Sequence, residues 1–493
     1  MTAHPSGLAR VILRNAGSQA AGRMLMTLLR FGVALIVLKS GGVELFGQYA
    51  LVLSLLAVAE WLVDFGQTDI AVRDLSVAPA QRGPTLAALA AIKLACVLVA
   101  VPALWLTAFL LDWSPALQQA MLAGAVAVPL YAAVLVYRVE FRTQMRMDRD
   151  AVAELLSTVV LLLSSWLVCR QGPNLPGLLL CYAAARGVYL LGCMAWARGA
   201  PRWQFAAGWQ GRLGPLVKAS LPLGLVGLVV CAYDALDVLA LTAWADHDET
   251  GNFSAALRVV MLAVIVVQAL AMAVFPVLAR QWVADRAMFQ RTMQATLDAA
   301  LLVGGALCCT LAVAAPGIAQ LLHPPGQAIA AALALLSWAI LARVVATVIG
   351  PMVIIAGRQI HNIWLTLLVL FAKAAALYGL VPLAGASGAA GAYLISEVAV
   401  GLLPTIWLCQ RVGGVRLSWS VPLRVLAAVV VVSGGARWLG LPGSLWDGAA
   451  AAGVFSLLCL AFGAVRREDF RRLRAALAQR RAPVAALPAV ASE

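Results

Sequence analysis

Residues 85–111 read TLAALAAIKLACVLVAVPALWLTAFLL, an uninterrupted run in which Lys93 is the single charged residue. About 20 predominantly apolar residues are enough for a helix to cross the hydrocarbon core of a bilayer. Similar runs recur along the whole chain of 493 residues, of which 63% are hydrophobic and 12% are charged. Ordinary soluble domains are roughly half apolar and a quarter charged. The sequence therefore excludes a soluble globular protein and predicts an integral membrane protein.

The apolar runs predict an all-α protein with about fourteen transmembrane helices. The connections between the runs are short, so a large soluble module is excluded. The predicted helices cover residues 19–38, 45–68, 85–111, 117–139, 152–169, 174–197, 215–243, 253–280, 294–316, 327–356, 362–382, 386–410, 421–440 and 444–464.

Lysine and arginine separate strongly between the two sets of connections. Most of the 36 basic residues lie in the two tails and in the connections that follow the even-numbered predicted helices. The connections that follow the odd-numbered helices contain Lys39, Arg170 and Arg437. Basic residues are enriched in the cytoplasmic loops of membrane proteins. We therefore expect both termini in the cytoplasm and the chain in the bacterial inner membrane. In a soluble protein the net charge of +14 would favour nucleic acid as a partner, but here the same asymmetry accounts for it and we expect none.

Two parts of the chain are similar to each other. Gly47-Gln48-Tyr49-Ala50 corresponds to Gly251-Asn252-Phe253-Ser254, and each motif lies at an outer turn between two predicted helices. Internal repeats of this kind are common in transporters. We therefore predict two six-helix lobes around a central cavity. The predicted segments are an N-lobe (1–200), a cytoplasmic linker (201–214), a C-lobe (215–410), two further helices (421–464) and a basic cytoplasmic tail (465–493) that suits anionic lipids.

Several charged residues lie inside the predicted helices, where each costs roughly 2.5–3.5 kcal/mol at the helix centre. Arg23 and Arg30 are two turns apart, on one side of the first helix. A water-filled cavity and interhelical ion pairs both explain such residues, and Arg23 could also reach the nearby cytoplasmic surface. Coupling to an ion or structural ion pairing is the expected role of Asp64, Asp234, Asp237, Arg343 and Glu397.

The opening of the chain resembles that of bacterial polysaccharide transporters. These are the O-antigen and exopolysaccharide flippases of the multidrug/oligosaccharidyl-lipid/polysaccharide (MOP) superfamily. The Asp-Phe-Gly-Leu form common in that family is interrupted here by Gln67. The arginines of the first helix and Arg258 also resemble those of the lipid II flippases, which implies a cationic cavity. The matching residues are Asn15, Leu45-Phe46-Gly47-Gln48-Tyr49, Val63-Asp64-Phe65-Gly66 and Arg73.

This resemblance implies a flippase that moves a polyprenyl-diphosphate-linked oligosaccharide from the cytoplasmic to the periplasmic leaflet. Alternating access, driven by the membrane potential or an ion gradient, is the expected mechanism. The residues expected to bind the diphosphate are Arg23, Arg30, Lys93 and Arg258. We expect no cofactor, no metal and no catalytic residue. Membrane lipids, a polymerase and export machinery are further expected partners.

Two other functions are compatible with the sequence. A multidrug or cation antiporter of the same superfamily would use an acidic cavity, with a proton or sodium site at Asp234 or Asp237. A membrane-embedded polysaccharide polymerase or ligase is the alternative from a different class. Such enzymes usually carry a large periplasmic loop, and no long outer loop is predicted here.

Overall fold

The computed structural model describes the chain except for residues 1–4, 112, 198–207, 356–358, 414–416 and 465–493. The predicted tail (465–493) and much of the predicted linker (201–214) therefore lie outside the described residues, and so does the side chain of Arg23. The described residues form helices joined by short connections, with no strand among them. The predicted all-α class is confirmed.

The helices coincide with the predicted apolar runs, and several extend beyond them. The first half contains α1 (Pro5–Asp64), α2 (Gln67–Val77), η1 (Pro79–Gln81), α3 (Arg82–Leu110), α4 (Pro115–Ala125), α5 (Ala127–Thr143), α6 (Met147–Gln171) and α7 (Leu175–Trp196). The second half contains α8 (Gln210–Trp244), α9 (His247–Ala284), α10 (Arg286–Leu322), α11 (Gln327–Ile355), α12 (Gln359–Ile395), the π-helix η2 (Ser396–Leu402), α13 (Leu403–Gly413), α14 (Ser420–Trp438) and α15 (Leu445–Ala461).

Within the described residues, 11 helical segments are long and apolar enough to cross a membrane. Two of them, Met24–Val77 and Trp364–Trp407, have 54 and 44 residues, which is about twice the length of one crossing. Each is interrupted at a glycine with positive φ, Gly42 at 77° and Gly385 at 51°, a conformation that glycine adopts without steric cost. The multi-pass membrane architecture is thus established, whereas fourteen crossings and the orientation of the termini remain predictions.

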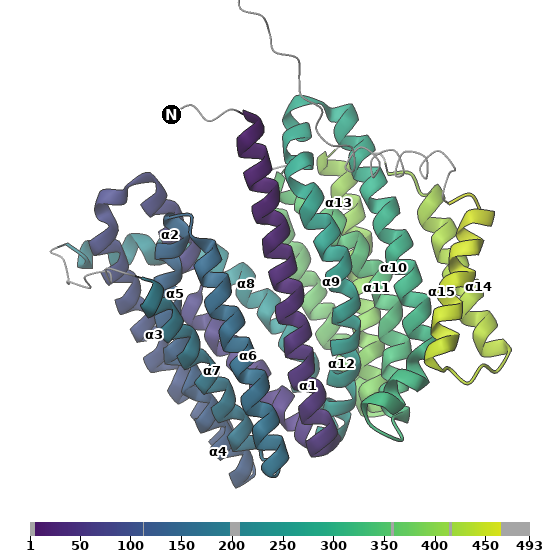
Figure 1. Ribbon diagram of the computed structural model, residues 1–493, viewed down its shortest axis with the longest axis horizontal. Coiled ribbons are helices and arrows are strands. Elements are labelled where there is room, and N and C mark those ends of the chain that lie inside the picture. Colours follow the sequence, from purple (N-terminus) through teal and green to yellow (C-terminus); the bar gives the residue numbers. More distant parts are fainter. Residues whose placement is uncertain (1–4, 112, 198–207, 356–358, 414–416, 465–493) are drawn as a thin grey trace, which may run out of the picture.

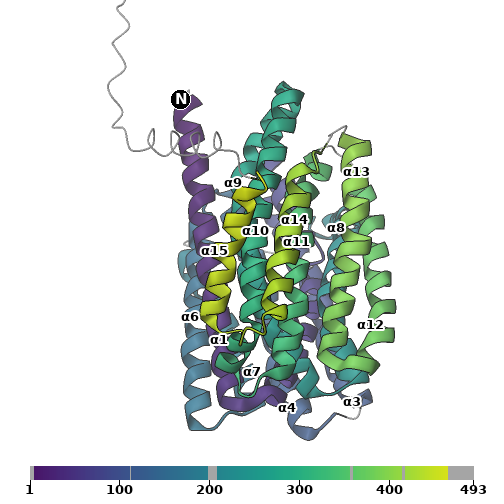
Figure 2. The same cartoon turned by 90° about the vertical axis from the view of Figure 1, so that its right-hand side faces the viewer.

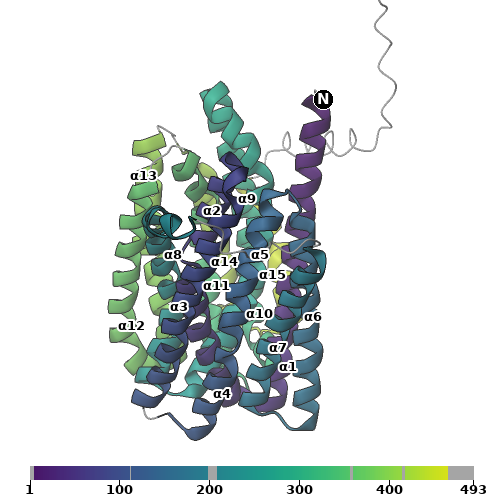
Figure 3. The same ribbon diagram turned by 90° about the vertical axis from the view of Figure 1, so that its left-hand side faces the viewer.

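The helices run roughly parallel and form two groups with α1 between them (Figure 1). Helices α2 to α7 lie on one side, and α9, α10, α11, α14 and α15 lie on the other. Figure 2 shows α14 and α15 at the outer edge of the second group, and Figure 3 shows α3, α5 and α6 on the outside of the first. Helix α1 packs against both α6 and α9, so it joins the two groups. The predicted lobe boundaries are not tested by this arrangement and remain a prediction.

The two copies of the repeated motif lie against each other. A Cβ atom added to Gly47 would overlap with the backbone oxygen of His247, and one added to Gly251 would overlap with the backbone of Val43. The backbones of α1 and α9 therefore touch at this point, which only glycine permits. This contact fixes α9 beside the helix that carries Arg30.

The Asp64-Phe65-Gly66 motif separates α1 from α2. Phe65 and Gly66 have φ values of 40° and 72°, which break the helix and turn the chain. The indole of Trp61 donates a hydrogen bond of 3.3 Å to the backbone oxygen of Gly224 in α8. The turn therefore anchors the end of α1 on the first helix of the second half.

Candidate functional site

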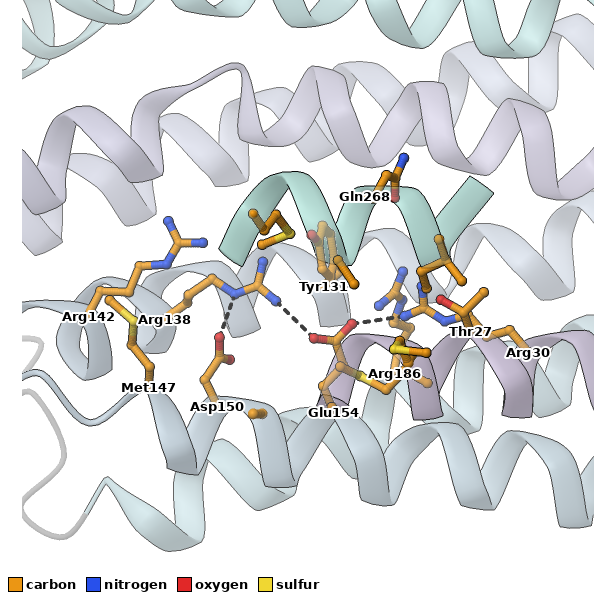
Figure 4. Close-up of a pocket in the computed structure, with 17 residues that line it drawn as sticks. Thr27, Arg30, Tyr131, Arg138, Arg142, Met147, Asp150, Glu154, Arg186 and Gln268 are labelled. Carbon is orange, nitrogen blue, oxygen red and sulfur yellow. Dashed lines mark hydrogen bonds and ion pairs between the residues drawn. The ribbon is translucent and has the colours of Figure 1, made fainter. Parts of the chain in front are cut away.

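A cavity of about 540 Å³ lies where α1, α5, α6, α7 and α9 meet. Figure 4 shows its charged side chains, most of which project from α1, α5 and α6. Helix α9 contributes Gln268 and the apolar residues Ile265, Ala269 and Met272. The wall is therefore strongly polar on one side and mostly apolar on the side of α9.

Basic residues outnumber acidic ones in this wall. Its acidic residues are Asp150 and Glu154, whereas its basic residues are Arg30, Arg138, Arg142 and Arg186. A guanidinium group presents its N–H donors in a planar fork that matches carboxylates and phosphates. The described lining thus favours an anionic ligand over a cationic one.

Two of these arginines are held in place by neighbouring groups. Arg186 donates to both carboxylate oxygens of Glu60, at 3.0 and 2.6 Å, and its guanidinium lies 4.4 Å from the centre of the Tyr131 ring. Arg138 lies 3.2 Å from Asp150 and donates a hydrogen bond of 2.6 Å to the hydroxyl of Tyr189. These contacts position the two guanidinium groups rather than leave them free.

Arg30 is more accessible than either of them. About half of its side chain is exposed, at 51%, and its one carboxylate partner among the described residues is Glu154, at 2.9 Å. Glu154 also lies 3.9 Å from Arg138, so it stands between two guanidinium groups (Figure 4). Arg30 is therefore the arginine of this wall that can most easily turn to a ligand.

A second cavity, of about 180 Å³, adjoins the first and shares Arg30 and Arg186 with it. Its wall includes Tyr49 and Arg258. The Arg258 guanidinium lies 5.8 Å from the centre of the Phe46 ring, and its Nε atom has no hydrogen-bond partner. Among the residues that the structure describes, no carboxylate pairs with Arg258. A partly buried, unpaired cation at the end of an arginine-lined space is what an anion site requires.

The polysaccharide biosynthesis protein family matches residues 12–282, which is more than half of the chain. The chain belongs to this family. No curated protein matches its sequence. The family agrees with the resemblance found in the first 75 residues, and it covers both α1 and α9, which line the cavity.

Solved structures with a similar fold are transporters of low sequence identity. The lipid II flippase MurJ, in an inward closed conformation, matches with a TM-score of 0.75 at 12% identity, over 92% of this chain and 99% of that one. An inward-facing multidrug resistance MATE family transporter of the MOP superfamily matches with a TM-score of 0.63 at 15% identity, over 80% of this chain and 95% of that one. A MOP superfamily transporter from Pyrococcus furiosus matches with a TM-score of 0.59 at 14% identity, over 82% of this chain and 97% of that one. This polysaccharide biosynthesis protein thus shares the fold of MOP superfamily transporters.

Lys93, expected to bind the diphosphate, lies away from both cavities of this polysaccharide biosynthesis protein. Its side chain is 2% exposed, and its ammonium group lies 3.1 Å from Asp64 and donates at 3.4 Å to the backbone oxygen of Val63. Asp64 also accepts a hydrogen bond from Thr68. The buried Lys93 thus pairs with the partly buried Asp64 beside the turn between α1 and α2.

The charged residues of the second half form their own cluster. Lys373 pairs with Asp237 at 2.7 Å and lies 3.7 Å from the centre of the Tyr233 ring, and both members of the pair are fully buried. Arg343 pairs with Glu397 at 2.6 Å, and Glu397 also accepts a hydrogen bond of 2.8 Å from Tyr233. Two ion pairs, Lys373–Asp237 and Arg343–Glu397, therefore lie close to Tyr233.

Asp234 differs from these neighbours. It is exposed, and among the described residues it has no ion-pair partner. The described residues contain no group of three His, Cys, Asp or Glu side chains arranged to hold a metal ion. Asp234 is thus the one acidic residue of the predicted set that stays available to a mobile cation.

Sequence reasoning missed most of the charged wall. Arg138 lies at the end of the predicted helix 117–139, Arg142 and Asp150 lie in the connection after it, and Glu154 lies in the predicted helix 152–169, but none of the four was predicted to line the site. A signal was present, because Arg138 and Arg142 are four residues apart and Asp150 and Glu154 are four apart on the next helix. Residues at this spacing share a helix face. Two adjacent helices with complementary charged faces could have been recognised as neighbours across a polar space.

Proposed function

We propose that this protein flips a polyprenyl-diphosphate-linked oligosaccharide from the cytoplasmic to the periplasmic leaflet, for the synthesis of a surface polysaccharide. The observation that carries the proposal is the arginine-lined pair of cavities, in which Arg30 is half exposed and Arg258 has no carboxylate partner among the described residues. Family membership and the MOP transporter fold support a lipid-linked substrate and a transport function.

The chemistry of such a cargo fits the two cavities. A sugar cannot cross hydrocarbon unaided, because each buried hydroxyl without a partner costs several kcal/mol, roughly 4–8 in a medium that cannot hydrogen-bond. A hydrated cavity of about 540 Å³ provides such partners. The diphosphate would bind Arg30 and Arg258, whose forks can each donate two hydrogen bonds to phosphate oxygens. Lys93 does not enter this proposal, because Asp64 already neutralises it away from the cavities.

The same observations disfavour a multidrug or cation antiporter. A cationic cargo would meet four arginines and only two carboxylates in the described wall of the larger cavity. Like charges at such distances repel each other strongly where water is scarce. The exposed Asp234 is the residue we assign to coupling, should a proton or sodium ion accompany the anionic cargo.

The proposed topology supplies a driving force. In it the chain makes fourteen crossings with both termini in the cytoplasm, because the segments that contain Gly42 and Gly385 each cross twice, once on each side of the glycine, and α15 crosses once. The inside of a bacterial cell is negative. Export of about two negative charges across roughly 100 mV therefore releases on the order of 4–5 kcal/mol. Flipping without ATP is feasible on this account.

Arg30 provides the cellular test. In a strain whose own copy is deleted, Arg30→Ala should abolish surface polysaccharide while the protein stays near normal abundance, because Arg30 is half exposed and the partly exposed Glu154 keeps Arg138 as a basic neighbour. Arg30→Lys should restore part of the activity, since an ammonium keeps the charge but loses the fork. Arg437→Ala is the matched control, because this arginine lies outside both arginine-lined cavities. Full polysaccharide synthesis by Arg30→Ala would overturn the proposal.

A further inference from the structure

Glu154 lies in the middle of the charged wall. Its carboxylate is 2.9 Å from Arg30 of α1 and 3.9 Å from Arg138 of α5, while Glu154 itself belongs to α6. The hydroxyls of Ser157 and Thr158 each donate a hydrogen bond of 2.8 Å to its backbone oxygen. A single acidic side chain thus connects three helices around the cavity.

The other arginines of this wall do not depend on Glu154. Arg186 has Glu60, Arg142 has Asp69 at 2.6 Å, and Arg138 has Asp150 and Tyr189. Arg30 has Glu154 as its one carboxylate partner among the described residues. An anion that binds the Arg30 fork therefore competes with one particular carboxylate, and both side chains are partly exposed, so the exchange needs no unfolding.

We propose that Glu154 is a positioning residue that competes with the phosphate of the cargo for Arg30. This proposal rests on the proposed function. In the empty protein Glu154 holds Arg30 against α6. The diphosphate, with about two negative charges, displaces the single charge of Glu154 and binds the Arg30 fork. On release Glu154 takes Arg30 back, and the wall returns to its starting state.

Competition between Glu154 and the diphosphate for Arg30 helps the protein to release its cargo. Binding along a transport path has to be favourable enough for entry and weak enough for departure. A diphosphate held by two arginines without a competitor would leave slowly. The exchange also has a mechanical consequence, because the Arg30–Glu154 contact ties α1 to α6. Cargo binding removes that tie from the helix that lies between the two groups (Figure 1).

The test measures binding of farnesyl diphosphate to the purified full-length protein in phosphatidylcholine nanodiscs. Glu154→Gln keeps the size of the side chain and removes its charge. It should tighten binding about two- to five-fold, as expected for loss of a competing, partly exposed ion pair. The tightening should appear mainly in the dissociation rate. Loss of a merely structural contact would instead lower thermal stability and weaken binding.

Two comparisons isolate the role of Arg30. Asp150→Asn removes the same charge from the same wall but leaves Arg30 paired, so its gain in affinity should be smaller. In an Arg30→Ala background, Glu154→Gln should give no gain, because the group it would free is absent. If Glu154→Gln does not fold, Glu154→Asp replaces it, with a shorter side chain and an intermediate gain.

The outcomes separate the two proposals. If the wild type does not bind farnesyl diphosphate, or binds it equally well without Arg30, the proposed function fails. If the wild type binds farnesyl diphosphate through Arg30 but removal of the Glu154 charge leaves the affinity unchanged or lower, the proposed role of Glu154 is contradicted and the proposed function is not. An equal gain for Glu154→Gln with and without Arg30 also overturns the exchange.

Discussion

At the scale of single residues, the arginines around the cavities fall into two kinds. Arg186 is clamped by Glu60 and by the hydroxyl of Tyr182, to which it donates at 2.8 Å, and Glu60 itself is 8% exposed. Arg258 has no such partner among the described residues. Removing a clamped arginine strands a buried carboxylate, whereas removing an unpaired one does not. The two kinds should therefore respond to substitution in opposite ways.

Arg186→Met should destabilise the protein by about 3–5 kcal/mol, the usual cost of leaving one member of a buried ion pair without its partner. The double variant Arg186→Met with Glu60→Gln should recover most of that loss, because the stranded charge is gone. Denaturant unfolding in detergent measures both changes. A double variant as unstable as the single one would show that Arg186 stabilises by packing on Tyr131 and not by its charge.

Arg30 was singled out in the sequence by its depth in an apolar run, and Arg258 by the resemblance to the lipid II flippases. The true partners were not predictable in the same way. Lys93 is as deep as Arg30, but the turn at Phe65 and Gly66 brings Asp64 to it, and no periodicity reveals that contact. Glu154 gains its importance from the position of α6 beside α1, which is a property of packing between distant segments.

At the scale of elements, α1 and α9 link the two halves of the chain by a direct contact between their backbones. The sequence identified Gly47 and Gly251 as equivalent positions of a repeat. It did not reveal that the two motifs touch each other. Hydropathy placed the helices well because burial in lipid demands apolar runs, whereas the breaks at Gly42 and Gly385 and the π-helix around Glu397 arise from packing.

Gly47→Ala should destabilise the protein by about 1–3 kcal/mol, since the added methyl group meets the backbone of α9 and the helices have to separate. Gly453→Ala is the matched control, because this glycine is an exposed position of α15 with no atom near its added Cβ. The control should be neutral or stabilising by up to ~1 kcal/mol, as for glycine replaced by alanine within a helix. Thermal unfolding in detergent compares the two, and equal effects would contradict the close contact.

At the scale of the whole molecule, the proposed orientation in the membrane rests on the distribution of basic residues. Single-cysteine variants should react with an impermeant reagent from outside at Asp248, the second residue of α9, and only from inside at Arg146 and Gln210. Basic residues flank the inside positions, and acidic ones surround Asp248. Labelling of Gln210 from outside would contradict the proposed topology and the direction of transport with it.

Transport through the arginine-lined cavities is the central claim, and reconstituted flipping tests it most directly. Proteoliposomes are loaded with a fluorescent polyprenyl-diphosphate-linked oligosaccharide, and an impermeant reductant reports how fast the inner-leaflet pool becomes accessible. The wild type should make that pool accessible to the reductant. Arg258→Ala should lower the rate about ten-fold or more, because a charge-assisted hydrogen bond contributes ~1.5–3 kcal/mol. The claim would be contradicted if Arg258→Ala flipped the lipid at the wild-type rate. It would also be contradicted if the wild type flipped the lipid no faster than protein-free liposomes do.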